Sequence, residues 1–174
     1  MKELHARVKE LEKILRSARP LILEGFSATP GSDPNRAAKL STKSKGSPKD
    51  LVTFYDKAVE AHLNQKFAKS FSGEIIIGEE DTAAKKRSPQ DLIASTRSKH
   101  FWVLDPIDGT TNFARAYPFF CTTAAFCEKT KAGWKVLAGA VYNPVSNEMF
   151  SAGLGLGATL NREQIKVSAV KKPI

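Results

Sequence analysis

The chain has 174 residues, enough for one domain with a buried core, and its 41% hydrophobic and 26% charged residues are ordinary for a globular protein. No uninterrupted apolar stretch approaches the length of a membrane span, and the charged N-terminus lacks the apolar segment of a secretory signal. Cys121 and Cys127 suit buried thiols, and the three histidines are scattered. We therefore expect a cytoplasmic protein without a disulfide.

The formal net charge of +9 has more than one interpretation. A basic surface attracts nucleic acid through its phosphates, independently of base sequence. The lysines and arginines are dispersed, however, and their densest short run is Lys85-Lys86-Arg87. We favour a solvated basic surface, which would also attract an anionic substrate, and keep nucleic acid as an alternative partner.

In the first part of the chain, apolar residues at helical spacing predict an amphipathic helix from Leu4 to Ile22, which Pro20 should kink or restart. Residues 27–50 are rich in Ser, Pro, Gly and Lys, and predict a long loop with a short strand near residues 38–41. Residues 51–53 favour a strand that runs into a helix. The apolar residues expected on the inner face of that helix are Ala58, Val59, Leu63 and Phe67.

The rest of the chain is predicted to be mostly strands. A short buried strand at residues 74–77 is followed by a polar insert with a helical turn at residues 90–94. Further strands are expected at residues 101–104, 119–128, 134–142, 148–152 and 164–167. Gly153, Gly155 and Gly157 follow a hairpin and open no helix, so they indicate a turn or bulge rather than a dinucleotide site. The order of elements predicts an α+β fold in which two N-terminal helices pack on a mostly antiparallel sheet.

The segment WVLDPIDGTTNF, residues 102–113, carries the clearest chemical signal. Asp105 and Asp108 follow an apolar strand, and Glu79 closes the earlier strand in the same way. If the two strands are neighbours, the three carboxylates converge, and such a cluster holds either protons or cations. Oxygen ligands of this kind suit Mg²⁺. The carbonyl of Ile107 can add a neutral ligand, and Asp105 can bridge two cations.

The residues after these aspartates fit a phosphoryl group. Gly109, Thr110 and Thr111 offer backbone N–H groups at the expected start of a helix, where anions bind. A threonine hydroxyl bonded to a carboxylate can orient or deprotonate a water molecule, and Thr110 with Asp56 is the candidate pair. Because Mg²⁺ activates the water and polarises the phosphoryl group, no covalent nucleophile is needed.

Three motifs together resemble the inositol monophosphatase family of magnesium-dependent, lithium-sensitive sugar phosphatases: WVLDPIDGTTNF, the Gly-Glu-Glu of residues 78–80, and DLVTFYDKAVE at residues 50–60. They occur in the family's order, and the resemblance extends over essentially the whole chain. An isolated Asp-Pro-x-Asp-Gly segment would also suit a simple turn. The other two motifs make a turn alone a poor explanation.

The resemblance implies a role for each matched position. Glu79, Asp105 and the Ile107 carbonyl match the ligands of a first metal ion, and Asp105 with Asp108 those of a second. Glu79 and Thr110 match the pair that activates water, with Asp56 supporting the threonine. Substrate binding is assigned to the residues that match the phosphate site and a nearby lysine: Gly109, Thr110 and Lys45. Family members commonly form homodimers, so a homodimer is expected here.

The resemblance also implies that residues 1–174 are the metal-binding N-terminal part of a longer family chain, whose C-terminal α/β subdomain supplies one more aspartate to the second metal site. We therefore expect these residues alone to be poorly active. Residues 110–113 favour inositol phosphatases over bisphosphate nucleotidases, while histidinol-phosphate and fructose-bisphosphate phosphatases stay open. The alternative function is an incomplete homologue that binds RNA or a protein partner.

Overall fold

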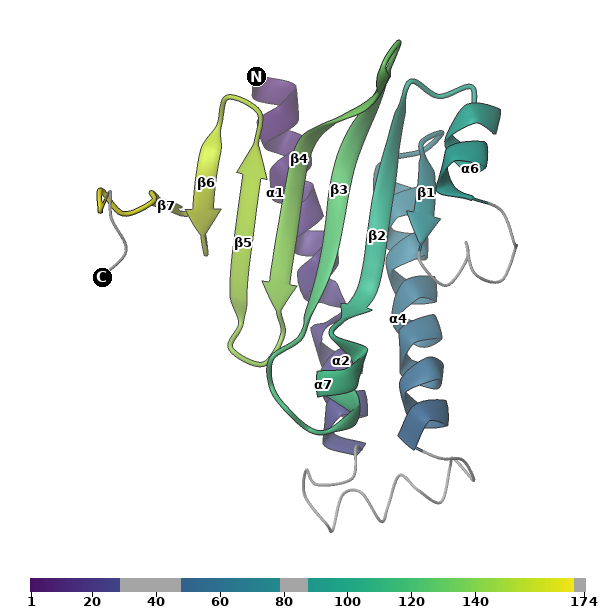
Figure 1. Cartoon of the computed structure of the whole chain (residues 1–174), viewed down its shortest axis with the longest axis vertical. Coiled ribbons are helices and arrows are strands. Elements are labelled where there is room, and N and C mark those ends of the chain that lie inside the picture. The colour runs from purple at the N-terminus through teal and green to yellow at the C-terminus, as the bar shows by residue number, and fades with distance from the viewer. Residues whose placement is uncertain (29–47, 79–87, 171–174) are drawn as a thin grey trace.

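The computed structural model describes residues 1–28, 48–78 and 88–170. Within these residues, the longest helices lie on one side of a single sheet (Figure 1), which confirms the predicted α+β class. Among the described residues, no helix is both long enough and apolar enough to span a membrane. The elements, in chain order, are α1 (Lys2–Ser17), α2 (Arg19–Ala28), α4 (Pro48–Ser70), β1 (Ile75–Gly78), α6 (Pro89–Ser95), β2 (His100–Asp108), α7 (Thr110–Ala114), β3 (Cys121–Thr130), β4 (Gly133–Asn143), β5 (Glu148–Gly153), β6 (Gly157–Leu160) and β7 (Glu163–Ile165).

The seven strands of the described residues lie side by side in the order in which they occur in the sequence. β1 and β2 are parallel, and every later neighbouring pair is antiparallel. The parallel pair needs a crossover, and α6 lies in that connection. The expectation of a mostly antiparallel sheet is therefore confirmed, and the strand that precedes Glu79 is indeed the neighbour of the strand that carries Asp105.

The first helix restarts near Pro20, as its sequence predicts. α1 ends at Ser17 and α2 begins at Arg19. Proline is tolerated in the first turn of a helix, where its missing N–H would have no partner within the helix. Ala18 and Ile22 continue the apolar face across this break and are buried. One amphipathic pattern therefore covers two helices.

The predicted strand at residues 51–53 is wrong, because these residues belong to α4. Their strand preference is a local tendency that a long helix overrides, and the helical spacing of Tyr55, Val59, Leu63 and Phe67 sets the conformation of the whole segment. Pro48, the first residue of the helix, favours a start at this point. The predicted loop and strand at residues 29–47 lie outside the described residues.

The C-terminal strands are close to their predicted positions, with one addition. β6 was not predicted, because four residues with a glycine and an alanine give little apolar alternation. Gly155 and Gly157 adopt positive φ angles of 76° and 79° between β5 and the start of β6. The three glycines therefore make a hairpin turn, as expected.

One face of the sheet is covered by α1, α2 and α4, which lie behind it in Figure 1. The residues beneath α1 are small: neighbouring positions across β3, β4 and β5 are Ala124, Ala140 and Ser151, all buried. Leu11 and Leu15 of α1 lie in the same core cluster and are fully buried. Small residues on the sheet thus leave room for the larger side chains of the helix.

The other face is covered mainly at its β1 edge within the part of the chain that the structure describes. There Ile93 of α6 packs on Ile77, Phe101 and Cys127 in a second, smaller core. Ser88 caps α6, because its hydroxyl accepts the backbone N–H of Asp91 at 3.1 Å. The remaining strands carry exposed apolar residues on this face, such as Val141 and Phe150, and we call it the open face.

Candidate functional site

A β-bulge places the two aspartates of the central motif on the same face of the sheet. Asp105 lies opposite Thr123, and Asp108 lies opposite Cys121, so three steps along β2 correspond to two along β3. In a regular strand, residues three apart point to opposite faces. The extra residue in β2 restores the alternation, while the Ile107 side chain turns into the core, where it is 1% exposed.

The two carboxylates differ in their surroundings. Asp105 is half-buried, and its Oδ1 is inaccessible to solvent, whereas Asp108 is exposed. The Cys121 thiol lies 3.8 Å from Asp108 Oδ2 and donates to it. Burial, and then the charges of Asp108 and Asp105, raise the pKa of Cys121 to about 11, so this thiol is protonated at neutral pH. The thiol is therefore a weak donor beside the carboxylate rather than a competing anion.

Gly109 forms the turn that follows β2. Its φ angle is 92°, and it precedes α7, whose Asn112 and Phe113 amides donate to the Gly109 carbonyl at 2.9 and 3.0 Å. A side chain at Gly109 would come within 3.3 Å of the Phe120 backbone. Glycine is therefore favoured both by the backbone angle and by the space. Thr110, the first residue of α7, is exposed, so a ligand can reach the start of this helix.

α4 contributes buried carboxylates from the helix side. It packs against β1, β2 and α7, and carries Asp56 and Glu60 one turn apart, 4% and 5% exposed. A methyl group at Gly78, the last residue of β1, would overlap the Glu60 carboxylate, so this glycine allows a close approach. Asp56 thus lies on the helix that packs against β1, β2 and α7. Its pairing with Thr110 stays a prediction.

Two predicted site residues, Glu79 and Lys45, lie outside the described residues. Their roles as metal ligand, catalytic residue and substrate contact therefore remain predictions. What the structure adds is the position of the preceding strand: Gly78 lies opposite Leu104, one residue before Asp105.

The chemistry of the described donors fits magnesium, although the set is partial. Asp105 and Asp108 offer carboxylate oxygens on one face, and oxygen is the ligand type that Mg²⁺ prefers. Within residues 1–28, 48–78 and 88–170, no three acidic, histidine or cysteine side chains lie close enough together to hold a metal ion. Residues beyond this pair, such as Glu79, or water would have to complete a metal site.

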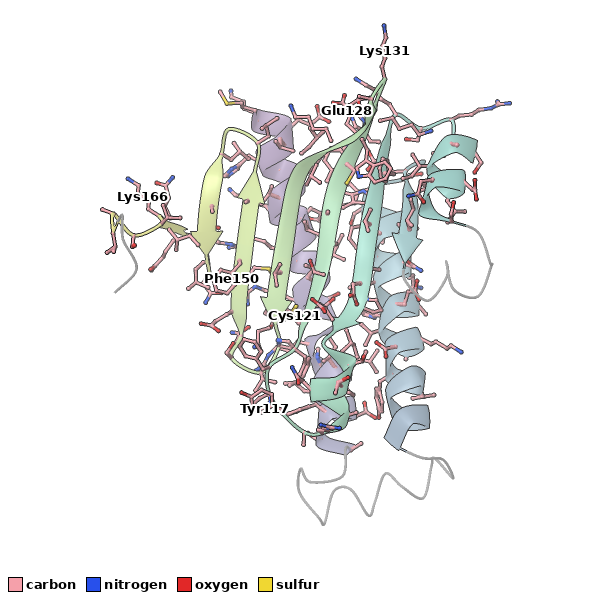
Figure 2. All side chains as sticks on the ribbon, in the orientation of Figure 1. Tyr117, Cys121, Glu128, Lys131, Phe150 and Lys166 are labelled. Carbon is pink, nitrogen blue, oxygen red and sulfur yellow. The ribbon has the colours of Figure 1, made fainter. Side chains whose placement is uncertain are left out.

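A cavity of about 480 Å³ opens beside Asp108 and Gly109. Its other walls are mostly apolar and come from the loop before β3 and from the open face of β4 and β5. Figure 2 shows Cys121 and Phe150 in this part of the sheet. The residues that line it, besides Asp108 and Gly109, are Asn112, Phe119, Phe120, Cys121, Val141, Asn143, Glu148 and Phe150.

Two neighbours of the site were not predicted from the sequence. Cys121 was interpreted as a buried core thiol, but it is half-buried and contacts Asp108. Glu60 was not predicted to lie near the site, although it follows Asp56 at the helical spacing of four residues. That spacing could have predicted that Glu60 lies on the same side of the helix as Asp56. The contact of Cys121 depends on the bulge that brings it opposite Asp108, and nothing in the sequence indicates that bulge.

The profile of the inositol monophosphatase family matches residues 8–173, and this chain belongs to that family. It is 39% identical over 122 residues to an inositol monophosphatase of Dictyostelium discoideum, covering 70% of this chain and 41% of that protein. It is 36% identical over 135 residues to the Nus factor SuhB of Vibrio cholerae, covering 78% and 45%. The structure of an inositol monophosphatase from Anabaena superposes with a TM-score of 0.68 and 25% identity, covering 98% of this chain and 51% of that one.

The chain thus spans less than half of the length of the curated relatives that it matches. The match to solved structures shows the same proportion, since nearly all of this chain superposes on about half of each relative. The family and the fold apply to residues 1–174, whereas the activity of the whole relatives belongs to the proposals that follow.

Proposed function

We propose that residues 1–174 provide the magnesium-binding part of a phosphatase that hydrolyses a small phosphomonoester, such as inositol 1-phosphate, by attack of water. The bulge that turns Asp105 and Asp108 to one face, directly before the Gly109 turn, carries this proposal. Relatives named inositol monophosphatase support the reaction class.

Each residue has a distinct part in this reaction. Asp105 and Asp108, with Glu79 and the Ile107 carbonyl, would hold Mg²⁺. When bound, the ion would lower the pKa of a water molecule and polarise the phosphoryl group. The backbone amides of Gly109 and Thr110 would receive the phosphate oxygens at the start of α7. Thr110, supported by Asp56, and Glu79 would take the proton from the attacking water, and Lys45 would steer the anionic substrate.

The test is phosphate release from inositol 1-phosphate, with and without Mg²⁺, for the wild type and Asp105→Asn. Glu163→Gln, an exposed change on β7, is the matched control. We expect weak release that requires Mg²⁺ in the wild type and the control, because these residues cover only part of the family chain, and no release above background in Asp105→Asn, because one ligand carboxylate is lost.

A second readout keeps metal binding separate from turnover. Mg²⁺ should raise the unfolding temperature of the wild type, but not of Asp105→Asn, because a ligand that binds the folded state stabilises it. If Mg²⁺ has no effect on the stability of either protein, and no phosphate is released, the metal proposal is wrong.

The second candidate is binding of RNA through the basic surface. The tip of the β3–β4 hairpin carries Lys131, which projects outward in Figure 2, and Trp134, which is 49% exposed. Exposed aromatic rings next to lysines suit stacking on bases and contact with phosphates. Salt-sensitive RNA binding by a chain that releases no phosphate would favour this function.

A further inference from the structure

The hairpin that joins β3 to β4 extends beyond the strands on either side of it. β2 pairs with β3 only as far as Glu128, and β5 pairs with β4 only from Ala138 onward. Residues 130–136, which we call the β3–β4 tip, therefore have no outer neighbour among the described strands. Figure 1 shows the tip reaching past the rest of the sheet. Its side chains belong to neither core, so the stability of the fold does not explain them.

Large apolar side chains are exposed at the β3–β4 tip. Trp134 is 49% exposed and Val136 is 55% exposed, and because they lie two residues apart on β4, they point to the same face. Leu154, 54% exposed, lies beside the base of the tip, since its N–H donates to the Leu137 carbonyl at 2.8 Å. Single exposed apolar residues are common, but three that gather on a projecting end mark a contact surface.

The β3–β4 tip is also basic. Lys131 and Lys135 are exposed, and Lys131 projects outward in Figure 2. The nearest acidic residue along the chain, Glu128, is the ion-pair partner of Lys99, and Lys129 follows it directly. The tip and its base therefore carry an excess of positive charge, which attracts an anionic surface.

We propose that the β3–β4 tip binds the surface of a membrane that contains anionic phospholipids. Tryptophan favours the boundary between headgroups and acyl chains, and Val136 and Leu154 bury apolar surface beside it. Each lysine close to an anionic membrane strengthens the attachment by about fivefold. The ring, the aliphatic side chains and the lysines thus all find a favourable environment at one surface.

RNA suits the same residues less well. Proteins bind single strands by stacking successive bases on several aromatic rings. The β3–β4 tip has a single ring, Trp134, and the large apolar side chains next to it, Val136 and Leu154, are aliphatic. A lipid surface buries these aliphatic side chains, whereas an RNA strand leaves them in water.

Attachment at the tip leaves the candidate site free. β3 runs from Cys121, beside Asp108, to Thr130, where the tip begins. Its ten residues span about 30 Å, at roughly 3.4 Å a residue. Figure 2 shows Cys121 and Lys131 far apart along the sheet. A ligand can therefore still reach Asp108 in the membrane-bound chain, and the proposal does not rest on the proposed phosphatase activity.

The test is sedimentation of the chain with vesicles of phosphatidylcholine, either alone or with about a quarter phosphatidylserine. We expect the chain to sediment only with the vesicles that contain phosphatidylserine, and added salt should release it, because salt screens exposed charges. Fluorescence locates the contact. Trp134 and the fully buried Trp102 are the two tryptophans of the chain, so a blue shift of the emission on addition of vesicles reports Trp134.

Variants at the tip should weaken this binding without unfolding the chain. Lys131→Gln combined with Lys135→Gln should weaken it by about 25-fold. Trp134→Ser should weaken it by about tenfold or more. Lys57→Gln and Phe54→Ser, exposed changes near the start of α4, are the matched controls and should have an effect of about twofold or less, because they lie outside the contact. Since all these positions are exposed, each variant should keep wild-type circular dichroism.

Three results would overturn the proposal. Sedimentation with neither kind of vesicle, or equally with both, would show that the chain does not recognise anionic lipid. Equal sedimentation of the wild type and the tip variants with anionic vesicles, without a change in tryptophan emission, would place the contact elsewhere on the basic surface. A change in emission with single-stranded RNA, and none with vesicles, would identify nucleic acid as the ligand. None of these readouts requires phosphate release, so failure here differs from failure of the proposed function.

Discussion

The two faces of the sheet differ in what covers them. Behind the sheet, α1 and α4 bury Trp102, Leu104 and Tyr142 completely or nearly so. In front, Val103 and Val141, each the immediate neighbour of one of those residues in sequence, are 41% exposed. Alternation along a strand therefore sends neighbouring residues into different environments.

This difference separates stability from function. The covered face holds the larger of the two cores, and its large side chains stabilise the fold. The open face carries Asp105, Asp108 and the cavity beside them, where side chains must remain accessible to a ligand. Substitutions on the covered face should therefore act mainly on the free energy of unfolding, and those at the site mainly on ligands.

The largest expected effect comes from Trp102 on the covered face. Its ring packs on Phe67, Phe71 and Phe126, with centroid distances of 4.6 to 4.9 Å, and its Nε1 donates to Glu74 at 2.7 Å. Trp102→Ala should lower the free energy of unfolding by about 3–5 kcal/mol, because it leaves a large cavity, while Glu74 keeps its ion pair with Arg7. Val103→Ala, the control on the open face, should cost less than about 1 kcal/mol.

Urea unfolding measures both variants. Equal losses for Trp102→Ala and Val103→Ala would show that the two faces contribute similarly to stability, and would contradict the larger role of the covered face.

The second largest expected effect is at Gly109, where an added side chain would meet both backbone strain and crowding. Gly109→Ala should cost about 2–3 kcal/mol, because alanine is strained at a φ angle of 92° and its methyl group crowds Phe120. Gly155→Ala is matched, since its φ angle is 76° but nothing lies within 4 Å, and it should cost about 1–2 kcal/mol. Thermal unfolding compares them. A smaller loss at Gly109 than at Gly155 would rule out crowding by Phe120.

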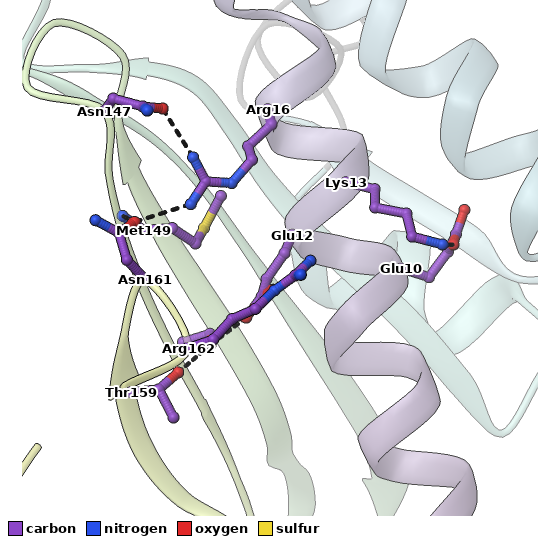
Figure 3. Close-up of polar contacts among 10 residues, drawn as sticks. Glu10, Glu12, Lys13, Arg16, Asn147, Met149, Thr159, Asn161 and Arg162 are labelled. Carbon is purple, nitrogen blue, oxygen red and sulfur yellow. Dashed lines mark hydrogen bonds and ion pairs between the residues drawn. The ribbon is translucent and has the colours of Figure 1, made fainter. Parts of the chain in front are cut away.

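A smaller effect lies at the edge of the covered face, where the end of the sheet is tied to α1. Glu12 is buried and accepts from Ser151 at 2.7 Å and from Arg162 at 3.0 Å (Figure 3). Arg162→Met should cost about 1–2 kcal/mol, because the carboxylate loses its cation but keeps the hydroxyl, and because the exposed arginine is screened.

Lys13→Met removes a solvent-exposed ion pair with Glu10 on the same helix and should cost less than about 0.5 kcal/mol. Chemical unfolding of both variants tests whether burial sets the value of the pair. Equal losses in the free energy of unfolding for the two variants would show that the burial of Glu12 does not strengthen its ion pair.

Much of the fold followed from periodicity in the sequence. The break near Pro20, predicted as a kink or a restart, and the positions of most later strands were correct, because each depends on local rules of spacing and proline geometry. The strand predicted at residues 51–53 failed because three residues were weighed without the longer helix around them. β6 was not predicted because its pairing with neighbouring strands, and not its own sequence pattern, makes it a strand.

The candidate site could be predicted only in part from the sequence. Asp105 and Asp108 were identified from their position at the end of an apolar strand, but their spacing of three gave no reason to expect the same face. The bulge that aligns them, and the contact between Cys121 and Asp108, depend on pairing with β3. The register between two strands depends on the whole sheet, so it cannot be predicted from the spacing of residues within one motif.

The smallest effect concerns pH and lies at the helices behind the covered face. Burial, and then the charge of Lys66, lower the pKa of His62, while a hydrogen bond with the backbone of Ser17 acts in the opposite direction. Because the folded pKa lies below the unfolded value of about 6.5, the folded state favours the neutral ring. Stability from His62 is complete above about pH 6.5 and falls as pH drops through the folded pKa. His62→Gln should therefore flatten the loss of unfolding temperature between about pH 7 and pH 5, a window in which exposed carboxylates stay ionised. If the fall in unfolding temperature is the same in His62→Gln as in the wild type, another group in the molecule causes it.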